Sequence, residues 1–362
     1  MRRRWRELAF AFSIALPVTF AAATNPVLAT TVERPPQFVA IAFDNCTEVS
    51  RWRELRDFAA RLNEKNETIH FTFFVSGVGL LASDKRSLYE GPHQRRGYAM
   101  IPFGSNADDV KERVGLINEM QAAGHEIASH AIGHFDGRGW SAADWSREFS
   151  EYRGLIDNVA ANNNLPDDVK FAFKGADIRG FRAPYLSTSA GLYPALKEAG
   201  FRYDTSGTML PNLWPEQRGG LWRFDLAEIR LARSKKMTLS MDYNFLIAQS
   251  LGLDVSARRT RDRDEMLETY IAYFKANYFG NRAPLHIGHH FTNYHGGAYH
   301  EALTAFIERV CGLPEVQCVT YSKLADFMDS LSPETRAAYQ KGDFPRATQP
   351  LILQDTPAAG LR

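Results

Sequence analysis

Short, continuous apolar segments that alternate with amphipathic ones are the feature that most limits how this chain can fold. Residues 69–76 and 284–290 are predicted strands, and residues 37–43 (Gln-Phe-Val-Ala-Ile-Ala-Phe) are one such continuous apolar segment. Segments of this kind are typical of strands that are covered on both faces of a sheet. Residues 52–63 and 108–123 have the apolar spacing of helices instead. The alternation predicts an α/β fold with a mostly parallel sheet.

The other predicted elements continue this alternation along the chain. Seven or eight strands in this order would suit a barrel. We find no internal repeat and no linker that would mark a second domain. We expect strands over residues 37–43, 69–76, 125–129, 180–182, 201–204, 238–242, 284–290 and 317–321, and helices over residues 52–63, 108–123, 145–162, 190–199, 265–277, 299–311 and 322–330.

Polar and ionisable residues stand at the ends of the predicted strands: Asp44, His130, Arg182, Asp242 and His290. The carboxyl ends of parallel strands meet at one edge of a barrel or an open sheet, and active sites are assembled there. We therefore expect these residues to lie close together. The segment 83–108 contains glycine and proline and is expected to be an insertion over the same edge.

Both ends of the chain are predicted to lie outside the folded domain. Arginines precede an apolar segment, residues 8–20, and small residues follow it, so residues 1–29 are expected to be a secretory signal peptide. An uncleaved anchor is the alternative, although this segment is shorter than the ~20 residues of a membrane span. Residues 30–330 would form a single domain, and the polar residues 331–362 a mobile tail. The protein is thus expected to be periplasmic or secreted, with no stable membrane span after processing.

The charge balance gives no reason to expect nucleic-acid binding. Lys and Arg number 43 against 42 Asp and Glu, a formal net charge of +1. Nucleic-acid binding proteins usually carry a strongly basic face.

The three cysteines are compatible with an exported protein that has one short disulfide. Cys311 and Cys318 flank Gly312-Leu313-Pro314, a turn sequence, and can close a small loop. Cys46 is then left over beside Asp44. We interpret it as a buried thiol, because no base adjoins it in the sequence that would make it a nucleophile.

Two pairs of residues suggest a metal site. His130 and His134 lie four residues apart after a predicted strand, and in a helical turn both rings could reach one metal ion. Asp44 and Asn45 end the first strand, where one side chain could act as a base while the other supplies an oxygen ligand. For that pair alone, an Asx turn is the alternative.

Two further segments carry ionisable groups. Arg182 in Phe-Arg-Ala-Pro-Tyr is a permanent cation beside a rigid proline and could hold a carboxylate. Residues 281–290 (Asn-Arg-Ala-Pro-Leu-His-Ile-Gly-His-His) contain three histidines in five positions, which packing alone hardly explains. Strand alternation places His286 and His290 on one face and His289 on the other.

In this order, the motifs resemble those of the polysaccharide deacetylases of carbohydrate esterase family four, above all the chitin deacetylase branch. The resemblance extends over residues 38–328 and includes the strings at 71–76, 124–128 and 213–215 (Phe-Thr-Phe-Phe-Val-Ser, Gly-His-Glu-Ile-Ala and Leu-Trp-Pro). It implies a distorted (β/α) barrel of about seven parallel strands and a divalent metal, usually zinc. It also implies a polysaccharide or oligosaccharide substrate with N-acetylated sugars.

The resemblance further implies which residues perform the hydrolysis. Asp44 corresponds to the general base of the family, and Arg182 to the residue that orients it. His290 corresponds to the general acid when the Asn-Arg-Ala-Pro-Leu strings are aligned without a gap. An alignment on a simple Leu-x-His motif would instead select His289 as the general acid.

The remaining roles follow from the same resemblance. Asp242 corresponds to the residue that tunes the acid, with Asp204 as a competitor. The backbone N–H of Tyr185 corresponds to the oxyanion donor. The implied metal ligands are Asn45, His130 and His134.

Asn45 departs from the pattern, because the family usually has a second aspartate there. An amide oxygen can bind a metal but brings no charge, so we expect a lower affinity or a changed metal preference. The leading hypothesis is a metal-dependent polysaccharide N-deacetylase. The alternatives are a non-catalytic carbohydrate-binding relative with a degenerate metal site, and a deacetylase of a small non-sugar amide.

Overall fold

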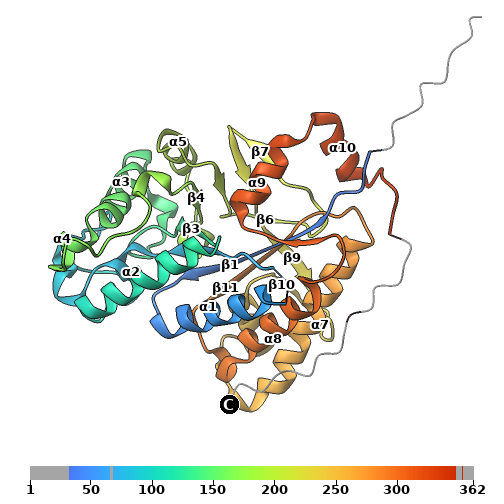
Figure 1. Ribbon diagram of the computed structural model, residues 1–362, viewed down its shortest axis with the longest axis horizontal. Coiled ribbons are helices and arrows are strands. Elements are labelled where there is room, and N and C mark those ends of the chain that lie inside the picture. The colour runs from blue at the N-terminus through green and yellow to red at the C-terminus, as the bar shows by residue number, and fades with distance from the viewer. Residues whose placement is uncertain (1–31, 66–67, 348–352, 354–362) are drawn as a thin grey trace, which may run out of the picture. The chain divides into compact units, whose positions relative to one another are not determined.

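The computed structural model describes residues 32–65, 68–347 and 353, which form strands surrounded by helices (Figure 1). The predicted signal peptide, residues 1–29, lies outside the described residues. In the part of the chain that is described, no helix is both long and apolar enough to cross a membrane.

The predicted alternation of strands and helices holds in most of the chain but is wrong for residues 203–239, where six strands follow one another with no helix between them. The strands are β1 (Gln37–Asn45), β2 (Thr72–Val75), β3 (Glu126–Ser129), β4 (Gly180–Phe181), β5 (Tyr203–Asp204), β6 (Thr208–Met209), β7 (Glu216–Arg218), β8 (Leu221–Arg223), β9 (Leu226–Arg230), β10 (Met237–Leu239), β11 (Leu285–His290) and β12 (Val316–Cys318). The helices are α1 (Val49–Asn63), α2 (Ala107–Ala122), α3 (Ala142–Asp157), α4 (Val159–Asn163), α5 (Leu192–Glu198), α6 (Asp242–Ser250), α7 (Arg259–Tyr278), α8 (Tyr294–Val310), α9 (Tyr321–Ser330) and α10 (Pro333–Lys341).

The main sheet has the order β11-β1-β2-β3-β4-β5-β8-β7. Each neighbouring pair from β11 to β8 is parallel, and only β7 at the edge pairs in the antiparallel direction. β12 also pairs in parallel with the start of β1. The predicted α/β fold with about seven parallel strands is therefore confirmed.

A small sheet of β10, β9 and β6 connects the two ends of the parallel sheet. The backbone N–H of Gly288 in β11 donates to the carbonyl of Ser240, and the Ser240 N–H donates to the carbonyl of Ala227 in β9. β9 in turn pairs with β6, which follows β5. This closure by Ser240, in place of a regular strand pair, makes the structure a distorted barrel, as expected.

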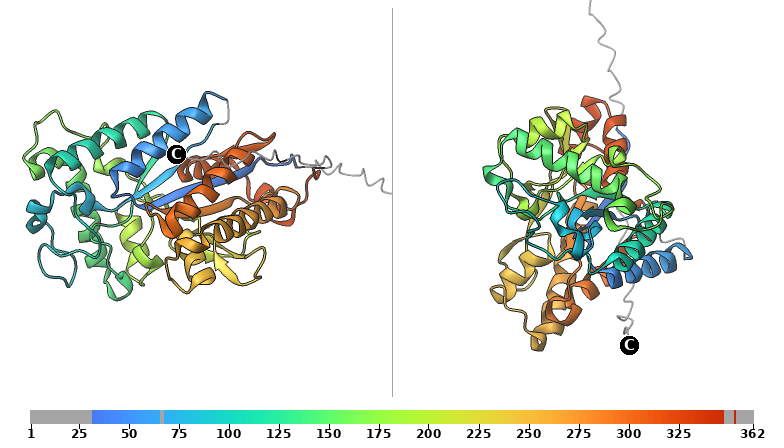
Figure 2. Two further views of the ribbon diagram at one scale, coloured as in Figure 1. Left: turned by 90° about the horizontal axis from the view of Figure 1, so that it is seen from below. Right: turned by 90° about the vertical axis from the view of Figure 1, so that its left-hand side faces the viewer.

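β1 is continuously apolar because both of its faces are covered. Val39, Ile41 and Phe43 pack in the larger hydrophobic cluster with the outer helices, which surround the strands in Figure 2. The alternate residues Phe38 and Ala42 pack in a second cluster, which includes residues of α9. Asp44 follows on this second, inner face, because side chains alternate along a strand. The same alternation that builds the core thus aims Asp44 at the barrel opening.

Helix α3 begins earlier than the apolar periodicity predicted. The side chain of Ser141 accepts a hydrogen bond from the Asp144 N–H, and the Asp144 carboxylate accepts one from the Ser141 N–H. This capping box satisfies two free N–H groups and begins the helix at Ala142, three residues before the first apolar position. The predicted single helix over 145–162 also ends at Asp157, and α4 follows it.

Two predictions about local structure were wrong. The expected strand 238–242 ends at Leu239, and Asp242 is instead the first residue of α6, a helix that was not predicted. The expected mobile tail from residue 331 contains α10, whose Tyr339 packs in the inner cluster with Phe344. Polar composition hid this helix, because only one of its residues is buried.

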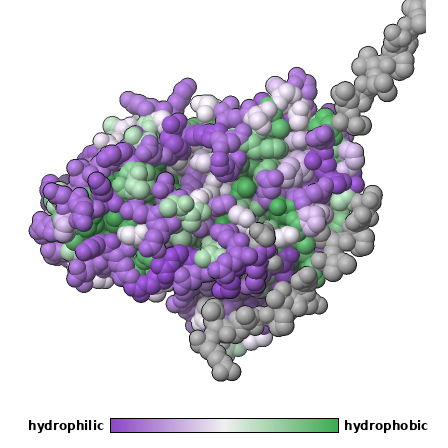
Figure 3. Space-filling view, in the orientation of Figure 1, coloured by the Kyte–Doolittle hydropathy of each residue, from purple (hydrophilic) through white to green (hydrophobic). Residues whose placement is uncertain are grey.

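The predicted disulfide between Cys311 and Cys318 is present, and Cys46 is a free, buried thiol. The face shown in Figure 3 is mostly hydrophilic, with small apolar areas between the polar side chains. Such scattered apolar atoms are ordinary on the surface of a folded domain.

Candidate active site

A cavity of about 410 Å³ opens at the carboxyl ends of the parallel strands. Six of the predicted site residues line it, and the other two, Arg182 and Asp242, are buried behind it. The predicted meeting of strand-end residues therefore occurs. The residues of the cavity wall are Asp44, Asn45, His130, His134, Ala183, Tyr185, Leu186, Leu239, Met241, Tyr243, Asn244, His290 and Tyr294.

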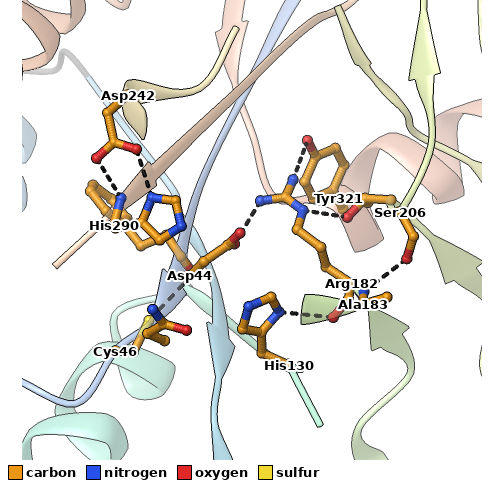
Figure 4. Close-up of polar contacts among 12 residues, drawn as sticks. Asp44, Cys46, His130, Arg182, Ala183, Ser206, Asp242, His290 and Tyr321 are labelled. Carbon is orange, nitrogen blue, oxygen red and sulfur yellow. Dashed lines mark hydrogen bonds and ion pairs between the residues drawn. The ribbon is translucent and has the colours of Figure 1, made fainter. Parts of the chain in front are cut away.

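Asp44 and Arg182 form a fully buried ion pair beside the cavity (Figure 4). Arg182 Nη1 donates to Asp44 Oδ1 at 2.7 Å. Burial opposes ionisation of Asp44, but the Arg182 charge, with those of His130 and His290, outweighs it and lowers the pKa of this carboxyl below its ordinary value. Asp44 is therefore a carboxylate at neutral pH.

Arg182 also fixes its neighbours on other strands. Its Nε donates to Thr205 Oγ1 at 2.7 Å, and its guanidinium lies over the Phe74 ring, 4.4 Å from the centroid. Its backbone carbonyl accepts a hydrogen bond from His130 Nδ1 at 2.8 Å. One residue thus orients Asp44 through its side chain and His130 through its main chain.

His290 contacts Asp242 at the end of β11, the strand next to that of Asp44. The ring Nδ1 lies 2.6 Å from Asp242 Oδ1, and the His290 N–H donates to Asp242 Oδ2 at 2.9 Å. Burial favours the neutral ring, but the Asp242 carboxylate outweighs it and raises the pKa of His290 above its ordinary value. The imidazolium form therefore persists to higher pH than in a free histidine.

The structure distinguishes His290 from the alternative His289. His289 points to the other face of β11, where its Nε2 lies 3.1 Å from the Tyr270 hydroxyl, and burial lowers the pKa of His289 to about 4. His286 shares the inner face with His290 but stacks on Tyr321 deep in the barrel. Of the three histidines, only His290 lines the cavity. The predicted alternation of their faces is confirmed.

The competitor Asp204 belongs to another cluster. Its carboxylate accepts hydrogen bonds from Ser206 and forms an ion pair with Arg223 at 2.9 Å. Burial raises the pKa of Asp204 to about 6. It contacts neither His290 nor the cavity wall, so the carboxylate beside His290 is Asp242.

His130 and His134 meet in the cavity wall, with ring centroids 5.2 Å apart. Burial lowers the pKa of His130 to about 4 and that of His134 to about 3. Both rings are therefore neutral at pH 7, which is the form that binds a metal ion. Because His130 Nδ1 faces the Arg182 carbonyl, its Nε2 keeps a free lone pair.

The helical turn expected between these histidines is absent. Ala131 and His134 both have left-handed backbone angles, with φ near 57° and 55°, so the segment forms a tight irregular loop. Gly133 at its centre allows the close packing: a Cβ there would lie 2.4 Å from Phe135 Cε2. The two rings converge because of this loop conformation and not because of helical spacing.

Glu148 is a supporting residue that the sequence did not reveal. It is fully buried on α3, and its Oε1 accepts hydrogen bonds from the Ile132 N–H at 2.8 Å and from the Tyr89 hydroxyl at 3.0 Å. Burial raises the pKa of Glu148 to about 7. Glu148 therefore connects the loop of His130 and His134 to the insertion 83–108, which contacts this loop again where the Met100 N–H donates to the Gly133 carbonyl. Strand-end patterns could not show it, because Glu148 lies in mid-helix.

Asn45 shares the cavity wall with the two histidines. Its φ of 67° is left-handed, and its Oδ1 lies 3.5 Å from Ser76 Oγ. Cys46 and Tyr185 beside the cavity are left-handed as well. Backbone conformations of this kind cost free energy in residues other than glycine and concentrate at functional sites.

Asn45, His130 and His134 fit a divalent cation in their donor chemistry. Two neutral imidazoles and one amide oxygen are accepted ligands, and His134 Nδ1 is buried without a hydrogen-bond partner. Within the described residues, no three His, Cys, Asp or Glu side chains form a group that could hold a metal ion. The third donor of this site is an amide, and Asp44 is already held by Arg182. The site thus lacks the charged oxygen ligand that would strengthen it.

Aromatic residues surround the cavity mouth. The Tyr185 ring is 56% exposed and lies against His134, with centroids 4.6 Å apart. Tyr243 and Tyr294 line the cavity near each other, with centroids 6.4 Å apart. Tyr243 was not predicted, because it lies on the unpredicted helix α6. These rings offer flat apolar surfaces such as sugar rings stack on.

Comparisons with known proteins point to one family. The sequence profile named Polysaccharide deacetylase matches residues 31–203. Chitin deacetylase 1 of Bombyx mori is 26% identical over 181 residues, which are 48% of this chain and 25% of that protein. The chain thus matches about a quarter of the length of this relative.

Two solved structures are similar over most of this chain. A candidate polysaccharide deacetylase from Mycobacterium smegmatis has a TM-score of 0.48 at 17% identity, covering 94% of this chain and 99% of that one. A family four pseudoenzyme from Bacillus anthracis has a TM-score of 0.39 at 12% identity, covering 80% and 66%. The profile match identifies residues 31–203 of this chain as a polysaccharide deacetylase domain.

Proposed function

We propose that the protein removes N-acetyl groups from a polysaccharide by hydrolysis, with Asp44 as the base and His290 as the acid. One observation carries the proposal: both side chains line the same cavity, and each is held by its own buried counter-charge. Arg182 lowers the pKa of Asp44 and so favours its ionised form, and Asp242 raises the pKa of His290 and so favours its protonated form. A proton acceptor and a proton donor that coexist at one pH are what amide hydrolysis needs.

The proposed reaction moves two protons. As the oxygen of a water bonds to the acetyl carbon, Asp44 takes a proton from that water. His290 then gives its proton to the sugar nitrogen as the carbon–nitrogen bond breaks. The products are acetic acid and a free amine, which exchange a proton to give acetate and an ammonium group, and the proton on Asp44 returns to His290 through solvent. The Tyr185 N–H is the proposed donor to the carbonyl oxygen, where such a donor contributes ~3 kcal/mol.

We further propose that Asn45, His130 and His134 hold a divalent cation, most naturally zinc, because imidazole is a preferred zinc ligand. When bound, such a cation polarises a carbonyl and lowers the pKa of a water molecule. The neutral state of both imidazoles supports this assignment. His130 and His134 are already neutral at pH 7, so neither ring has to lose a proton before it binds the cation.

An N-acetylated glycan is the proposed substrate. The similarity to a chitin deacetylase supports it, as does the aromatic mouth formed by Tyr185, Tyr243 and Tyr294. Export by the predicted signal peptide, residues 1–29, is part of the proposal and rests on the sequence pattern.

Asn45 favours a second candidate function, carbohydrate binding without catalysis. Loss of a charged metal ligand is a change that could leave the cavity able to bind a sugar and unable to hydrolyse it. The intact Asp44–Arg182 and His290–Asp242 pairs favour the enzyme, because a binding protein needs neither.

Acetate release separates these possibilities. The protein would be stripped with a chelator and reloaded with Zn²⁺, Co²⁺ or Mn²⁺. It would then be assayed on N-acetylglucosamine oligomers, peptidoglycan fragments, N-acetylated exopolysaccharide and simple acetamides, with calorimetric glycan binding in parallel. Glycan deacetylation confirms the proposal. Glycan binding without acetate release under any loading supports the binding protein, and turnover of simple acetamides alone supports a small-amide hydrolase.

A further inference from the structure

Apolar side chains are exposed on α6 and on the turn that follows it, next to the cavity mouth. Tyr243, Ile247, Leu251 and Leu253 are 46%, 40%, 83% and 64% exposed. Only ten large hydrophobic residues in the described part of the chain are exposed, and four of them lie here. Tyr243 and Ile247 stand four residues apart and share one face of α6, while Leu251 is the left-handed residue that ends the helix and Leu253 follows it. We call these four residues the apolar ridge.

The β9–β10 hairpin places cations beside this ridge. Lys236 Nζ donates to the carbonyl of Ala248 on α6 at 3.0 Å, so the hairpin end lies against the second half of that helix. Arg230, Lys235 and Lys236 form no ion pair with any carboxylate among the described residues, and their recorded hydrogen bonds go to backbone carbonyls. We call these three residues the basic hairpin.

Most carboxylates near the ridge are buried or already paired. Residues 228–268 contain eight Lys and Arg against seven Asp and Glu. Glu268 pairs with Arg233, Asp264 with Arg263, and Glu228 accepts a hydrogen bond from the Thr208 hydroxyl. Asp242 and Asp262 are buried, and Asp254 accepts a hydrogen bond from the His295 N–H at 2.6 Å. Met237, another exposed apolar residue, lies opposite Arg230 in the hairpin. Both views of Figure 2 show the gold segment that contains α6 at the periphery of the strands.

We propose that the apolar ridge and the basic hairpin dock on the surface of an anionic phospholipid bilayer. Aliphatic side chains gain free energy when they enter the acyl region, and adjacent Lys and Arg side chains pair with lipid phosphates. A surface that combines both features matches the chemistry of a bilayer interface. The proposal does not depend on the deacetylase activity.

Two other occupants fit the surface less well. Leu251 and Leu253 project from it and offer no hydrogen-bonding group, whereas a glycan chain needs polar partners for its hydroxyls. A second copy of the chain on a two-fold axis would place the same surface on both sides of the contact. The two basic hairpins would then face each other and repel.

Docking would fix the orientation of the cavity relative to the bilayer. Tyr243 belongs to the ridge and also lines the cavity, and Leu239, the last residue of β10 in the hairpin, is part of the same wall. A docked protein would therefore hold the cavity mouth close to the bilayer surface. The substrate chains it reaches would be those at that surface.

Vesicle sedimentation tests the proposal with the full chain. The probes are vesicles of phosphatidylcholine alone and of phosphatidylcholine mixed with phosphatidylglycerol. We expect binding to the anionic vesicles, little binding to the neutral ones, and weakening with added salt. The variants Leu251→Ser/Leu253→Ser and Lys235→Glu/Lys236→Glu should each lower the partition coefficient at least about tenfold. The double variant Leu88→Ser/Lys111→Glu, at exposed positions elsewhere, is the matched control and should bind like the wild type.

Other outcomes would overturn the proposal. Equal binding of the wild type and both ridge variants, or no binding to anionic vesicles, contradicts it. Dimerisation that the ridge variants abolish, without vesicle binding, would assign the surface to a second copy. Glycan affinity that the ridge variants remove, again without vesicle binding, would assign it to the substrate. Thermal unfolding of each variant shows whether a loss of binding reflects a loss of folding.

Discussion

His290 and Asp242 are joined by two contacts, from the ring Nδ1 at 2.6 Å and from the backbone N–H at 2.9 Å. His290 is the last residue of β11, and Asp242 is the first residue of α6. The start of one helix thus fixes both the tautomer and the orientation of a ring at the end of a strand. With Nδ1 engaged, Nε2 is the nitrogen left to face the cavity.

The first prediction concerns the pH dependence of deacetylation. Asp44 must be ionised and its pKa is lowered, so the acid limb should lie below the ordinary aspartate range. His290 must be protonated and its pKa is raised, so activity should fall only above ~6.5, the ordinary histidine pKa. Asp242→Asn removes the charge that raises the His290 pKa, and the alkaline limb should move to lower pH. Profiles of kcat/KM against pH measure this.

The exposed Asp57 supplies the control for this experiment. Asp57→Asn should leave both limbs in place. An alkaline limb that does not move in Asp242→Asn would show that His290 is not the titrating acid.

The second prediction concerns stability. Arg182→Met leaves Asp44 as a buried carboxylate without a counter-charge, and breaking such a pair costs ~3–5 kcal/mol. Because the folded pKa of Asp44 is lowered, its ionisation stabilises the wild type above the unfolded pKa, and this contribution is lost as the pH falls through the folded pKa. Arg182→Met should lack this pH dependence. Urea unfolding at several pH values measures both effects.

Arg53→Met is the comparison, because Arg53 forms an exposed ion pair with Glu112. Such pairs contribute ~0–1 kcal/mol. Equal costs for the two variants would mean that the buried pair does not stabilise the fold.

The third prediction concerns the metal. Asn45→Asp adds a charged oxygen donor beside His130 and His134, so the protein should retain more divalent metal after dialysis. Metal analysis and Zn²⁺ titration by calorimetry measure the affinity without reference to activity. A lower or unchanged affinity in Asn45→Asp would exclude Asn45 as a ligand.

The fourth prediction concerns Glu148. Glu148→Leu leaves the Ile132 N–H without its acceptor, at a cost of ~1–3 kcal/mol in stability. The loop of His130 and His134 should loosen, and metal affinity should fall by about 10–100-fold, as for other supporting contacts. Glu148→Gln keeps an acceptor oxygen and should therefore retain most of the stability and most of the metal affinity. Glu151→Leu, on the exposed side of α3, should change neither.

Much of the fold could be predicted because its periodicity is strong. β1 is almost continuously apolar, and it pairs with β11 in the register that brings Asp44 opposite His290. α6 and α10 were missed for physical reasons. α6 has a mixed exposed face, because the apolar ridge lies on it, and α10 buries only Tyr339.

The site residues at strand ends could be predicted from the sequence, but the loop and helix residues that hold them in place could not. Asp44, Arg182 and His290 follow from strand ends and motif order. The convergence of His130 and His134 depends on left-handed residues and on Glu148 from α3, which no local spacing indicates. Side chains that act from the middle of a helix are set by tertiary packing.

The central claim is that Asp44 is the base of a deacetylase, and acetate release by Asp44→Asn tests it most directly. Asparagine keeps the shape and a contact to Arg182 but cannot take a proton. With metal-loaded protein and the best glycan substrate, we predict turnover by the wild type and a loss of about 10²–10⁴-fold in the variant, with the fold retained. Equal rates for the two proteins, or no acetate from the wild type with any divalent metal, would contradict the account.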